Sequence, residues 1–313
     1  MKCTICDSEA IIEIRYSGSS LCRDHFVDFF ERRVKKEIRD QVRLTQRKGT
    51  IAVALSGGKD SSVTLYVLKK FLGPWRYLRI VAFTVDEGIA GYRPKGIESA
   101  RKLCESLGIE HRIKAFTEIV GNTMDEIVSM DPKGIPCSYC GPARRHAMND
   151  ASLDYDADYV ALGINLDDYA QSILMNVAKG DVQRMSRLAP HHTRVEGMIP
   201  RIVPLRSIPE REVLTYAIIN KIPFDSSWCP YYERAHRNSF RDVISILEER
   251  SPGTRHAIMN FLDGILPALR TVSEEFSPKK CKGCGRVSSW DYCSLCKEMD
   301  RLRKGAAEPT ESY

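Results

Sequence analysis

The spacing of apolar residues divides the chain into a long amphipathic helix near the N-terminus and a central region of alternating strands and helices. Phe26, Phe30, Val34, Ile38 and Val42 recur every four residues, which places them on one face of a helix. From residue 50 onward, short apolar runs alternate with longer amphipathic segments, a pattern that indicates a parallel sheet with helices on both faces. The predicted strands are 50–55, 79–86, 111–116 and 158–163, and the predicted helices are 62–72, 95–107, 117–130, 143–151 and 168–178.

The pattern is weaker beyond residue 180. Residues 180–208 contain three prolines and many basic side chains, and they are predicted to be rich in loops. Helices are expected again over 210–220, 239–249 and 254–269. The segment 271–280 is predicted to be a linker, and 304–313 a disordered tail.

The composition of the 313-residue chain predicts a soluble protein of roughly two domains. Apolar residues make up 43%, and none of their runs approaches the ~20 residues that a membrane helix needs. The start of the chain shows no secretion signal, so we expect a cytoplasmic protein. The net charge of +6 is small, but cations gather between residues 32 and 48 and between 179 and 206. Such clusters suit either a nucleic-acid backbone or solvated helix faces.

A glycine-containing loop lies directly between the first predicted strand and the helix that follows it. Its residues are Ser56, Gly57, Gly58, Lys59, Asp60 and Ser61. The glycines let backbone N–H groups approach an anion, and the helix N-terminus favours negative charge. Lys59 can neutralise phosphate, and the two serines can donate hydrogen bonds. The spacing differs from the Gly-x-x-x-x-Gly-Lys-Ser/Thr loop and resembles the pyrophosphate loop (PP-loop) of enzymes that cleave ATP between the α- and β-phosphates.

Ten of the eleven cysteines fall into three sets, and two of these sets are complete quartets. The quartets are Cys3, Cys6, Cys22 and His25 near the N-terminus, and Cys281, Cys284, Cys293 and Cys296 near the C-terminus. Paired Cys-x-x-Cys and Cys-x-x-His spacing without an export signal predicts tetrahedral zinc sites rather than disulfides. These modules would fasten the two ends of the chain. Lys282, Arg286 and Trp290 beside the second quartet are candidates for RNA contacts.

The middle set is one ligand short. Cys137 and Cys140 form a Cys-x-x-Cys pair, and Cys229 is the third member. Three thiolates could hold a 4Fe–4S cluster with one open iron, a zinc ion with an open position, or a catalytic pair that carries a persulfide. Cys104 is expected on the apolar side of a helix and is predicted to be a core residue.

Together these motifs resemble one enzyme family over nearly the whole chain. The PP-loop, Pro-Cys-x-x-Cys-Gly-x-x-Arg-Arg at residues 136–145, the distant Cys229 and the two quartets occur in the order found in the tRNA 2-thiouridine synthetases. This is the TtuA group, related to the cytosolic wobble-uridine thiolases. The resemblance implies that ATP adenylates O2 of a uridine, and that sulfur delivered at the open iron of a 4Fe–4S cluster then replaces this oxygen.

The resemblance also assigns roles to residues. Cys137, Cys140 and Cys229 would hold the cluster, and Cys137 and Cys229 would act in catalysis with Lys59. Arg144 stands where the family often has a phosphate-contacting Lys or Arg, and it is a further catalytic candidate. The adenine would lie along the ends of the first two strands. The residues expected around ATP are Ala54, Ser56, Gly57, Gly58, Lys59, Asp60, Ser61, Val85, Arg144, Gly163 and Asp168.

Residues 163–168, Gly-Ile-Asn-Leu-Asp-Asp, correspond to a Gly-His-Asn-x-Asp-Asp segment of the family. Asp168 is the expected catalytic carboxylate, which could assist proton transfer or orient the uridine. From its position alone, it could instead cap the helix that begins there. Ile164 replaces the usual His of this segment, and Tyr169 replaces an acidic residue that often follows it.

The resemblance implies an α/β fold with a parallel-sheet PP-loop ATP pyrophosphatase domain of the adenine nucleotide α-hydrolase type. The expected segments are an N-terminal zinc finger (1–25), a basic linker helix (26–48), the PP-loop domain (49–208), a helical extension with the third cysteine (209–272), a C-terminal zinc finger (273–300) and a tail (301–313). The expected cofactors are ATP, Mg²⁺, a 4Fe–4S cluster and two Zn²⁺. The expected partners are tRNA, a sulfur donor (sulfide or a thiocarboxylated ubiquitin-like carrier) and a second copy of the chain, with no membrane.

Three alternatives use some of the same motifs. The tRNA 2-thiocytidine synthetases share the loop and the three cysteines but lack paired terminal quartets. Lysidine synthetases share the loop but need no cluster, so the three cysteines argue against them. A non-catalytic zinc-ribbon scaffold that binds tRNA would need neither Lys59 and Asp60 nor the open cysteine set.

Overall fold

The centre of the molecule is a parallel sheet whose first strand lies in the middle. The computed structural model describes residues 1–42, 48–188, 190, 195–234, 237–272 and 278–305. In these residues the five strands lie in the order β5–β4–β3–β6–β7, all parallel, which confirms the predicted α/β class. Their bounds are Gly49–Ala54 for β3, Leu78–Asp86 for β4, His111–Ala115 for β5, Tyr159–Leu162 for β6 and Arg201–Ile202 for β7.

The strand order reverses beside β3, between β3 and β6. The chain moves outward from β3 to β4 and β5, and then returns to β6 on the other side of β3. Connections after β3 and β6 therefore leave in opposite directions, and ligands of open α/β sheets bind at such reversals, beyond the carboxyl ends of the strands. The PP-loop follows β3 and Gly163 follows β6, so the fold brings two predicted motifs to this one place.

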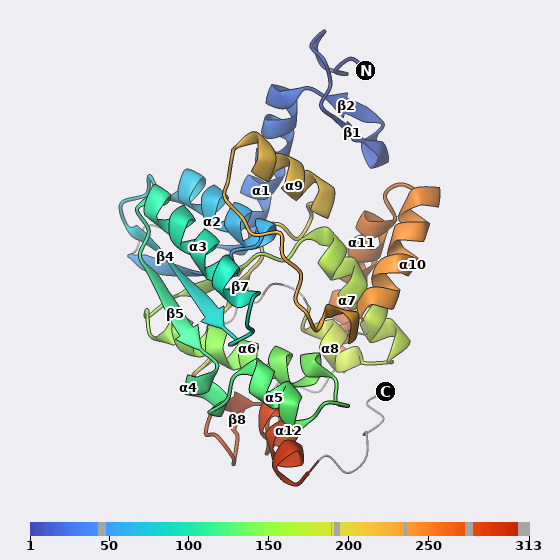
Figure 1. The fold of residues 1–313 in the computed structure, drawn as a ribbon. Coiled ribbons are helices and arrows are strands. Elements are labelled where there is room, and N and C mark those ends of the chain that lie inside the picture. Colours follow the sequence, from blue (N-terminus) through green and yellow to red (C-terminus); the bar gives the residue numbers. More distant parts are fainter. Residues whose placement is uncertain (43–47, 189, 191–194, 235–236, 273–277, 306–313) are drawn as a thin grey trace.

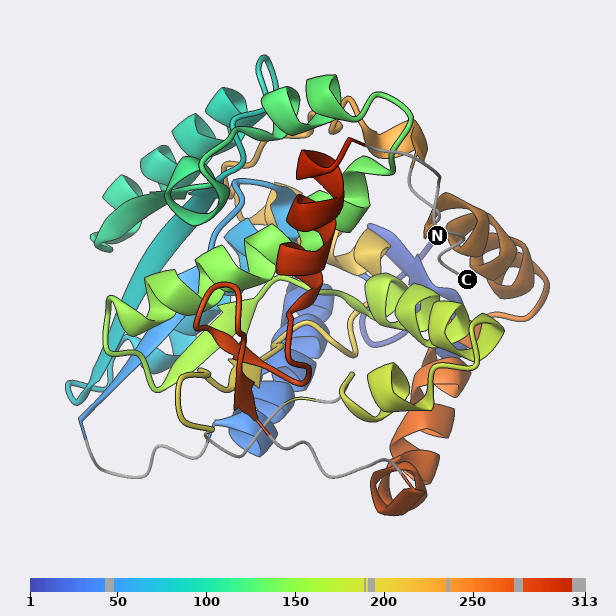
Figure 2. The same cartoon turned by 90° about the horizontal axis from the view of Figure 1, so that it is seen from below.

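Helices cover both faces of the sheet (Figure 1). Their bounds are Arg23–Gln41 for α1, Lys59–Leu72 for α2, Arg93–Leu107 for α3, Pro136–Leu153 for α6, Glu210–Ile219 for α9 and Ser294–Arg303 for α12. The helices α2 and α3 pack on one face, and α1 and α9 lie over α2. On the opposite face α6 packs against the sheet, and Figure 2 shows α12 lying across α6. The helices α1 and α12 thus lie on opposite faces of the sheet.

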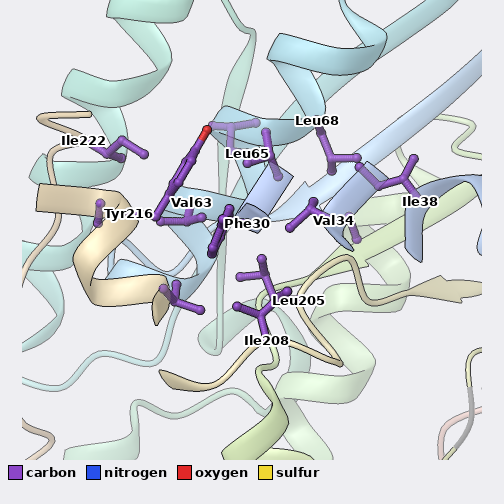
Figure 3. Close-up of a cluster of buried hydrophobic side chains, with 14 of the residues drawn as sticks. Phe30, Val34, Ile38, Val63, Leu65, Leu68, Leu205, Ile208, Tyr216 and Ile222 are labelled. Atoms are coloured by element: carbon purple, nitrogen blue, oxygen red, sulfur yellow. The ribbon is translucent and has the colours of Figure 1, made fainter. Parts of the chain in front are cut away.

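The apolar stripe predicted for the first helix forms the core beneath α9 (Figure 3). Phe30 and Val34 are fully buried and Ile38 nearly so. The ring of Phe30 stacks on that of Tyr216 in α9, with 4.1 Å between centroids and 12° between planes. Leu65 of α2 closes this cluster from the side of the sheet. The stripe therefore fixes α1 to the body of the protein.

The N-terminal module is a small hairpin fastened to distant helices. Its strands are Ile12–Ile14 (β1) and Ser19–Leu21 (β2). Between them, the hydroxyl of Tyr16 donates to Oε1 of Glu212 in α9 at 2.7 Å, and Arg33 Nη1 of α1 donates to that hydroxyl at 2.7 Å. The Tyr16 ring also lies 4.3 Å from the ring of His256. These contacts hold the module against three helices.

A group of helices lies beside the sheet, at the right of Figure 1. Their bounds are Leu166–Ala178 for α7, Val182–Ser186 for α8, Arg237–Arg250 for α10 and Thr254–Val272 for α11. Ile173, Met185, Leu262 and Leu266 form a small separate core that joins α7, α8 and α11. Among the helices that the structure describes, none combines the length and the apolar composition that crossing a bilayer requires.

The structure corrects several predicted elements. The helix expected over 117–130 is two helices, Thr117–Val120 (α4) and Met124–Met130 (α5). Gly121 ends the first with φ +81°, and the side chains of Thr123 and Glu126 form a capping box that starts the second. The helix predicted over 143–151 begins earlier, at Pro136, a residue suited to the first helical position, and therefore includes Cys137 and Cys140.

The region 180–208, predicted to be loops, contains α8 and the fifth strand β7, which is too short to show an apolar alternation. The predicted linker 271–280 also contains structure, because α11 continues to Val272 and β8 (Lys279–Lys280) pairs with β9 (Val287–Ser288). Residues 273–277, the tail from 306 onward, and five members of the basic clusters lie outside the described residues. These five are Arg43, Arg47, His191, His192 and Arg194.

Candidate active site

The turn after β3 contains a glycine that a larger residue could not replace. Gly57 has φ +85°, and a Cβ there would lie 2.0 Å from the carbonyl oxygen of Gly96. Gly58 precedes α2 and has no side chain, so the first N–H groups of the helix stay available to an anion. The Ser56 and Ser61 hydroxyls lie 3.0 Å apart, and Ser61 donates to the Gly58 carbonyl. These serines brace the loop from within.

Lys59 is held between two carboxylates. Its Nζ lies 2.9 Å from Oδ2 of Asp60 and 2.7 Å from Oε1 of Glu210, the first residue of α9. Burial alone lowers the pKa of Lys59, but the two carboxylates outweigh burial and raise it, so the ammonium stays charged. A bound phosphate would compete with Glu210 for this ammonium. Sequence reasoning missed Glu210, because its approach to Lys59 depends on how α9 packs.

The end of β6 lies directly against the loop. A Cβ at Gly163 would come within 2.5 Å of the backbone nitrogen of Ser61, so the two turns touch. Asn165 caps α7 by accepting from the N–H of Asp168, and its amide donates to Oδ1 of Asp60 at 3.0 Å. The helix begins two residues before its predicted start, and the cap is Asn165, not Asp168. Asp168 takes the third helical position, facing the loop.

Asp168 is a carboxylate in a recess of the protein. About a quarter of its side chain remains accessible (26%), yet the surrounding protein excludes enough water to raise its pKa to about 6. Asp60 and Glu210 add to this rise, whereas Arg237 opposes it. Arg237 Nη1 lies 3.2 Å from Oδ1 of Asp168, and its Nη2 donates to the hydroxyl of Ser172. A carboxylate with this pKa is suited to accept a proton near neutral pH.

The neighbouring Asp167 has a different role. It accepts the backbone N–H of Glu210 at 2.8 Å and pairs with Arg255 of α11 at 2.7 Å. Asp167 therefore joins the start of α7 to α9 and α11. Of the two adjacent aspartates, one holds helices together and the other faces the site.

The three central cysteines come together from two parts of the chain. Cys137 and Cys140 lie in the first turns of α6, and Cys229 approaches from the segment after α9. Burial raises the pKa of Cys137, and the charges of Cys140 and Cys229 raise it further. The other two thiols therefore lie close enough to Cys137 for their charges to act on it. The segment of Cys229 is also tied to the PP-loop, because the N–H of Asp225 donates to the Gly57 carbonyl at 2.8 Å.

The spread of these three thiols favours a cluster over a single ion. Among the described residues, only the terminal quartets bring three or more ligand atoms all within 4.8 Å of one another. Zn–S bonds of about 2.3 Å place sulfur atoms about 3.8 Å apart, and the three central thiols are not all drawn together as closely as those of the quartets. A cluster of four irons spans a wider set of thiolates.

A chain of charged side chains connects the cysteines to the PP-loop. Arg144 Nη2 lies 3.3 Å from Sγ of Cys140 and 3.0 Å from Oε1 of Glu87. Glu87 also pairs with Arg93, and both side chains are almost fully buried. Arg93 Nη1 then donates to the Ser56 carbonyl at 3.0 Å. Sequence reasoning missed Glu87 and Arg93, although Glu87 directly follows β4 at the carboxyl edge of the sheet.

The remaining predicted nucleotide contacts, Ala54 and Val85, lie at the ends of strands. Ala54 ends β3, and Val85 lies one residue before the end of β4 with its side chain in the core.

The two departures from the family pattern, Ile164 and Tyr169, lie in packed positions. Ile164 packs against the core that contains Val85. Tyr169 is buried, with the guanidinium of Arg206 5.5 Å from its ring centroid. Both replacements therefore fit their surroundings.

Both terminal quartets have the dimensions of a tetrahedral metal site. The sulfur atoms of Cys6 and Cys22 lie 3.8 Å apart, as do those of Cys284 and Cys293. Nδ1 of His25 lies 3.3 Å from Sγ of Cys22. Zinc at about 2.3 Å from sulfur and 2.0–2.1 Å from nitrogen gives edges of about 3.8 and 3.5 Å, which the quartets match.

The residues expected to contact RNA beside the second quartet differ in availability. Arg286 binds Asp150 of α6 through Nη2 at 2.8 Å and Nε at 3.0 Å, so it fixes the module to the sheet domain. Lys282 pairs with Asp291 at the surface. Trp290 is half exposed.

Comparison with known proteins places these features in a family. Residues 28–247 match the PP-loop domain, and residues 2–27 match the N-terminal LIM domain of the 2-thiouridine synthetase TtuA. The chain belongs to the TtuA/NcsA-type tRNA thiolation proteins. This finding confirms the family predicted from the motifs.

Relatives of this TtuA/NcsA-type protein match along almost its full length. It is 37% identical over 300 residues to the tRNA-5-methyluridine(54) 2-sulfurtransferase of Pyrococcus horikoshii, covering 95% of this chain and 93% of that one. It is 33% identical to the tRNA 2-thiolation protein NcsA of Haloferax volcanii, covering 96% and 99%. The structure of the U34-tRNA thiolase NcsA from Methanococcus maripaludis with its [4Fe-4S] cluster is similar at a TM-score of 0.82 and 34% identity, covering 99% of both chains.

Proposed function

We propose that this enzyme uses ATP to activate a uridine of tRNA and replaces its O2 with sulfur, forming 2-thiouridine. The contact between Asp225 and Gly57 carries the proposal, because it joins the segment of Cys229 to the PP-loop. Asp168 lies within electrostatic reach of Asp60 in the PP-loop, and Asn165, which caps the same helix, bonds to Asp60. A base held there could meet both the nucleotide and the sulfur without leaving. The relatives, named as tRNA sulfurtransferases and thiolases, support tRNA as the substrate.

In the first step, O2 of the uridine attacks the α-phosphorus of ATP, and the bond to the bridging oxygen breaks to release pyrophosphate. The amides after Gly57 and Gly58, with Lys59, hold the leaving pyrophosphate. Ionised Asp168 accepts the N3 proton, which makes O2 nucleophilic. In the second step, hydrosulfide attacks C2, and the C2–O2 bond breaks as AMP leaves with that oxygen. The sulfide proton ends on N3, and Asp168 releases its proton to solvent.

The central cysteines are suited to assist the second step. Cys137, Cys140 and Cys229 would hold a 4Fe–4S cluster through three irons, which suits their spread and their origin on two segments. When bound, the cluster supplies one iron with an open position for the sulfur donor. Arg144 places a positive charge beside Cys140 and is linked to the PP-loop through Glu87 and Arg93, so it would offset negative charge that develops on the departing phosphates.

The proposal extends to cofactors and partners. Mg²⁺ would bind mainly through phosphate oxygens and water. Zinc would occupy the two terminal quartets, and sulfide or a thiocarboxylated ubiquitin-like carrier would supply sulfur. We propose a homodimer with the six-segment organisation given above. Relatives in Danio rerio and Arabidopsis thaliana are named cytoplasmic tRNA 2-thiolation protein 1, which supports a cytoplasmic location.

Anaerobic reconstitution tests the proposal. The iron-loaded enzyme is incubated with ATP, Mg²⁺, sulfide and unmodified tRNA, and nucleosides are identified by mass spectrometry. We expect equal amounts of 2-thiouridine, AMP and pyrophosphate. Formation of 2-thiocytidine would assign the enzyme to the cytidine group instead, and tRNA binding without pyrophosphate release would indicate a scaffold. Mass spectrometry of nuclease fragments distinguishes the wobble uridine from the thymine-loop uridine.

Replacing Arg237 with glutamine should shift the pH dependence of thiolation. Arg237 lowers the pKa of Asp168, so its removal raises that pKa above about 6. Because the mechanism needs the ionised carboxylate, the acid limb of kcat/KM should move to higher pH by about 1 unit. Arg250→Gln at the far end of α10 is the matched control and should leave the profile unchanged. An identical profile in both variants would show that Asp168 is not the titrating group.

A further inference from the structure

The short segment from Asp225 to Cys229 spans the distance between the two halves of the site. Asp225 donates to the Gly57 carbonyl and pairs with Gly58 as an isolated parallel bridge. Four residues later, Cys229 joins the other central cysteines. Trp228 immediately precedes Cys229, and 62% of its surface is exposed. A base that reacts first at the PP-loop and then with sulfur at the cysteines would therefore pass close to this segment.

The Trp228 ring is oriented by its neighbours without being covered by them. Its centroid lies 4.8 Å from that of Tyr232, with 61° between the planes. The guanidinium of Arg241 lies 5.4 Å from the Trp228 centroid and 5.8 Å from the Tyr232 centroid. Arg241 Nη1 also donates to the Tyr232 hydroxyl at 3.2 Å, which fixes the group. A large aromatic ring that is supported from one side and exposed on the other is typical of a binding surface.

The surroundings of this ring belong to the active site. Arg237 Nη1 lies 3.2 Å from Oδ1 of Asp168, and Arg241, whose guanidinium lies beside the Trp228 ring, follows about one turn later on the same face of α10. Trp228 therefore lies beside the cations that surround the reacting groups. Aromatic rings and guanidinium planes are the side chains on which unpaired bases stack. A negatively charged backbone that follows such a base would meet the two arginines.

We propose that Trp228 is a stacking platform for an unpaired base of the tRNA, either the target uridine or its neighbour. The inference rests on the proposed thiolation and names a residue that binds its substrate. Tyr232 and Arg241 would position the platform. The ring would hold the base between the PP-loop and the cysteines while activation and sulfur transfer take place.

The test compares Trp228→Ala with Trp228→Phe in the iron-loaded enzyme, with sulfide as the donor so that no carrier protein is present. Loss of one stacked base weakens binding by about 5- to 150-fold. Trp228→Ala should raise the Kd for unmodified tRNA, and the KM for tRNA, by a factor in this range. Trp228→Phe should retain most of the affinity. Trp75→Ala removes a tryptophan that is 43% exposed before β4, at the opposite edge of the sheet, and should change neither value.

The iron content and the Kd for ATP of Trp228→Ala are measured as well. Unchanged values show that the substitution has not damaged Cys229 or the loop at Gly57. A Trp228→Ala enzyme that keeps its iron and binds tRNA like the wild type overturns the proposal. Suppose that Trp228→Ala binds tRNA and uses sulfide like the wild type but thiolates slowly when a carrier protein supplies the sulfur. Trp228 then contacts the carrier, and base stacking is also overturned. If the wild type forms no thionucleoside but Trp228→Ala still weakens tRNA binding, the proposed function fails while the platform stands.

Discussion

Replacing Asp168 with asparagine is expected to slow tRNA thiolation by about 10²- to 10⁴-fold. Asparagine keeps the size of the side chain and can still accept the backbone N–H of Asn165. It cannot take a proton, whereas the wild-type carboxyl, with a pKa of about 6, is ionised at neutral pH and can. ATP binding should change little, because Lys59 and the loop amides remain. Single-turnover formation of 2-thiouridine, beside the Kd for ATP, measures the effect.

Asp167→Asn is the matched control for this prediction. Asp167 accepts the N–H of Glu210 and pairs with Arg255, so its loss should lower the free energy of unfolding by about 1–3 kcal/mol. Its effect on the rate at a temperature where the fold persists should be small. A wild-type rate in Asp168→Asn would remove Asp168 from the chemistry and leave it only its place in the capping box of α7.

Replacing Cys229 with serine is expected to stop 2-thiouridine formation while ATP-dependent pyrophosphate release continues. Removal of a residue that only supports a metal ligand lowers activity by roughly 10- to 100-fold. The rate of 2-thiouridine formation should fall by more than this, because Cys229 is itself a ligand. Adenylation should persist, since Asp225 still fastens this segment to Gly57. Iron content, pyrophosphate release and thionucleoside formation are measured on the same anaerobic preparation.

Cys104→Ala provides the control. Cys104 is buried in α3, and burial raises the pKa of its thiol to about 12, so it is an unreactive core residue. The variant should keep its iron and its thiolation rate and lose only some stability. If Cys229→Ser retained full iron and continued to form 2-thiouridine, the assignment of the central cysteines would be wrong.

Motifs that directly follow a strand could be found from the sequence. The PP-loop and Asp168 come after β3 and β6, and parallel strands place their carboxyl ends along one edge. Glu210 and Arg237 could not be found in this way. They reach Lys59 and Asp168 across 151 and 69 positions of the chain, and only the packing of α9 and α10 brings them there.

The different roles of Asp167 and Asp168 could not be predicted from the sequence either. Two adjacent acidic residues at a helix start look alike in sequence, and both could cap the helix or act in chemistry. Because they occupy successive positions of α7, their side chains point in different directions. Asp167 therefore contacts Arg255, and Asp168 contacts Arg237. Which of them faces the PP-loop depends on where Asn165 begins the helix.

The docking of the N-terminal segment has a consequence for the synthesis of this protein. Tyr16 bonds to Glu212, 196 positions later, and Phe30 stacks on Tyr216. At about 5–20 residues per second, a ribosome needs roughly 10–40 s to make the chain between such partners. The part of the α1 stripe that packs against α9 therefore stays uncovered while most of the chain is still being translated. This face of the domain closes late in translation, and a nascent chain halted before α9 would present an uncovered helix to chaperones and proteases.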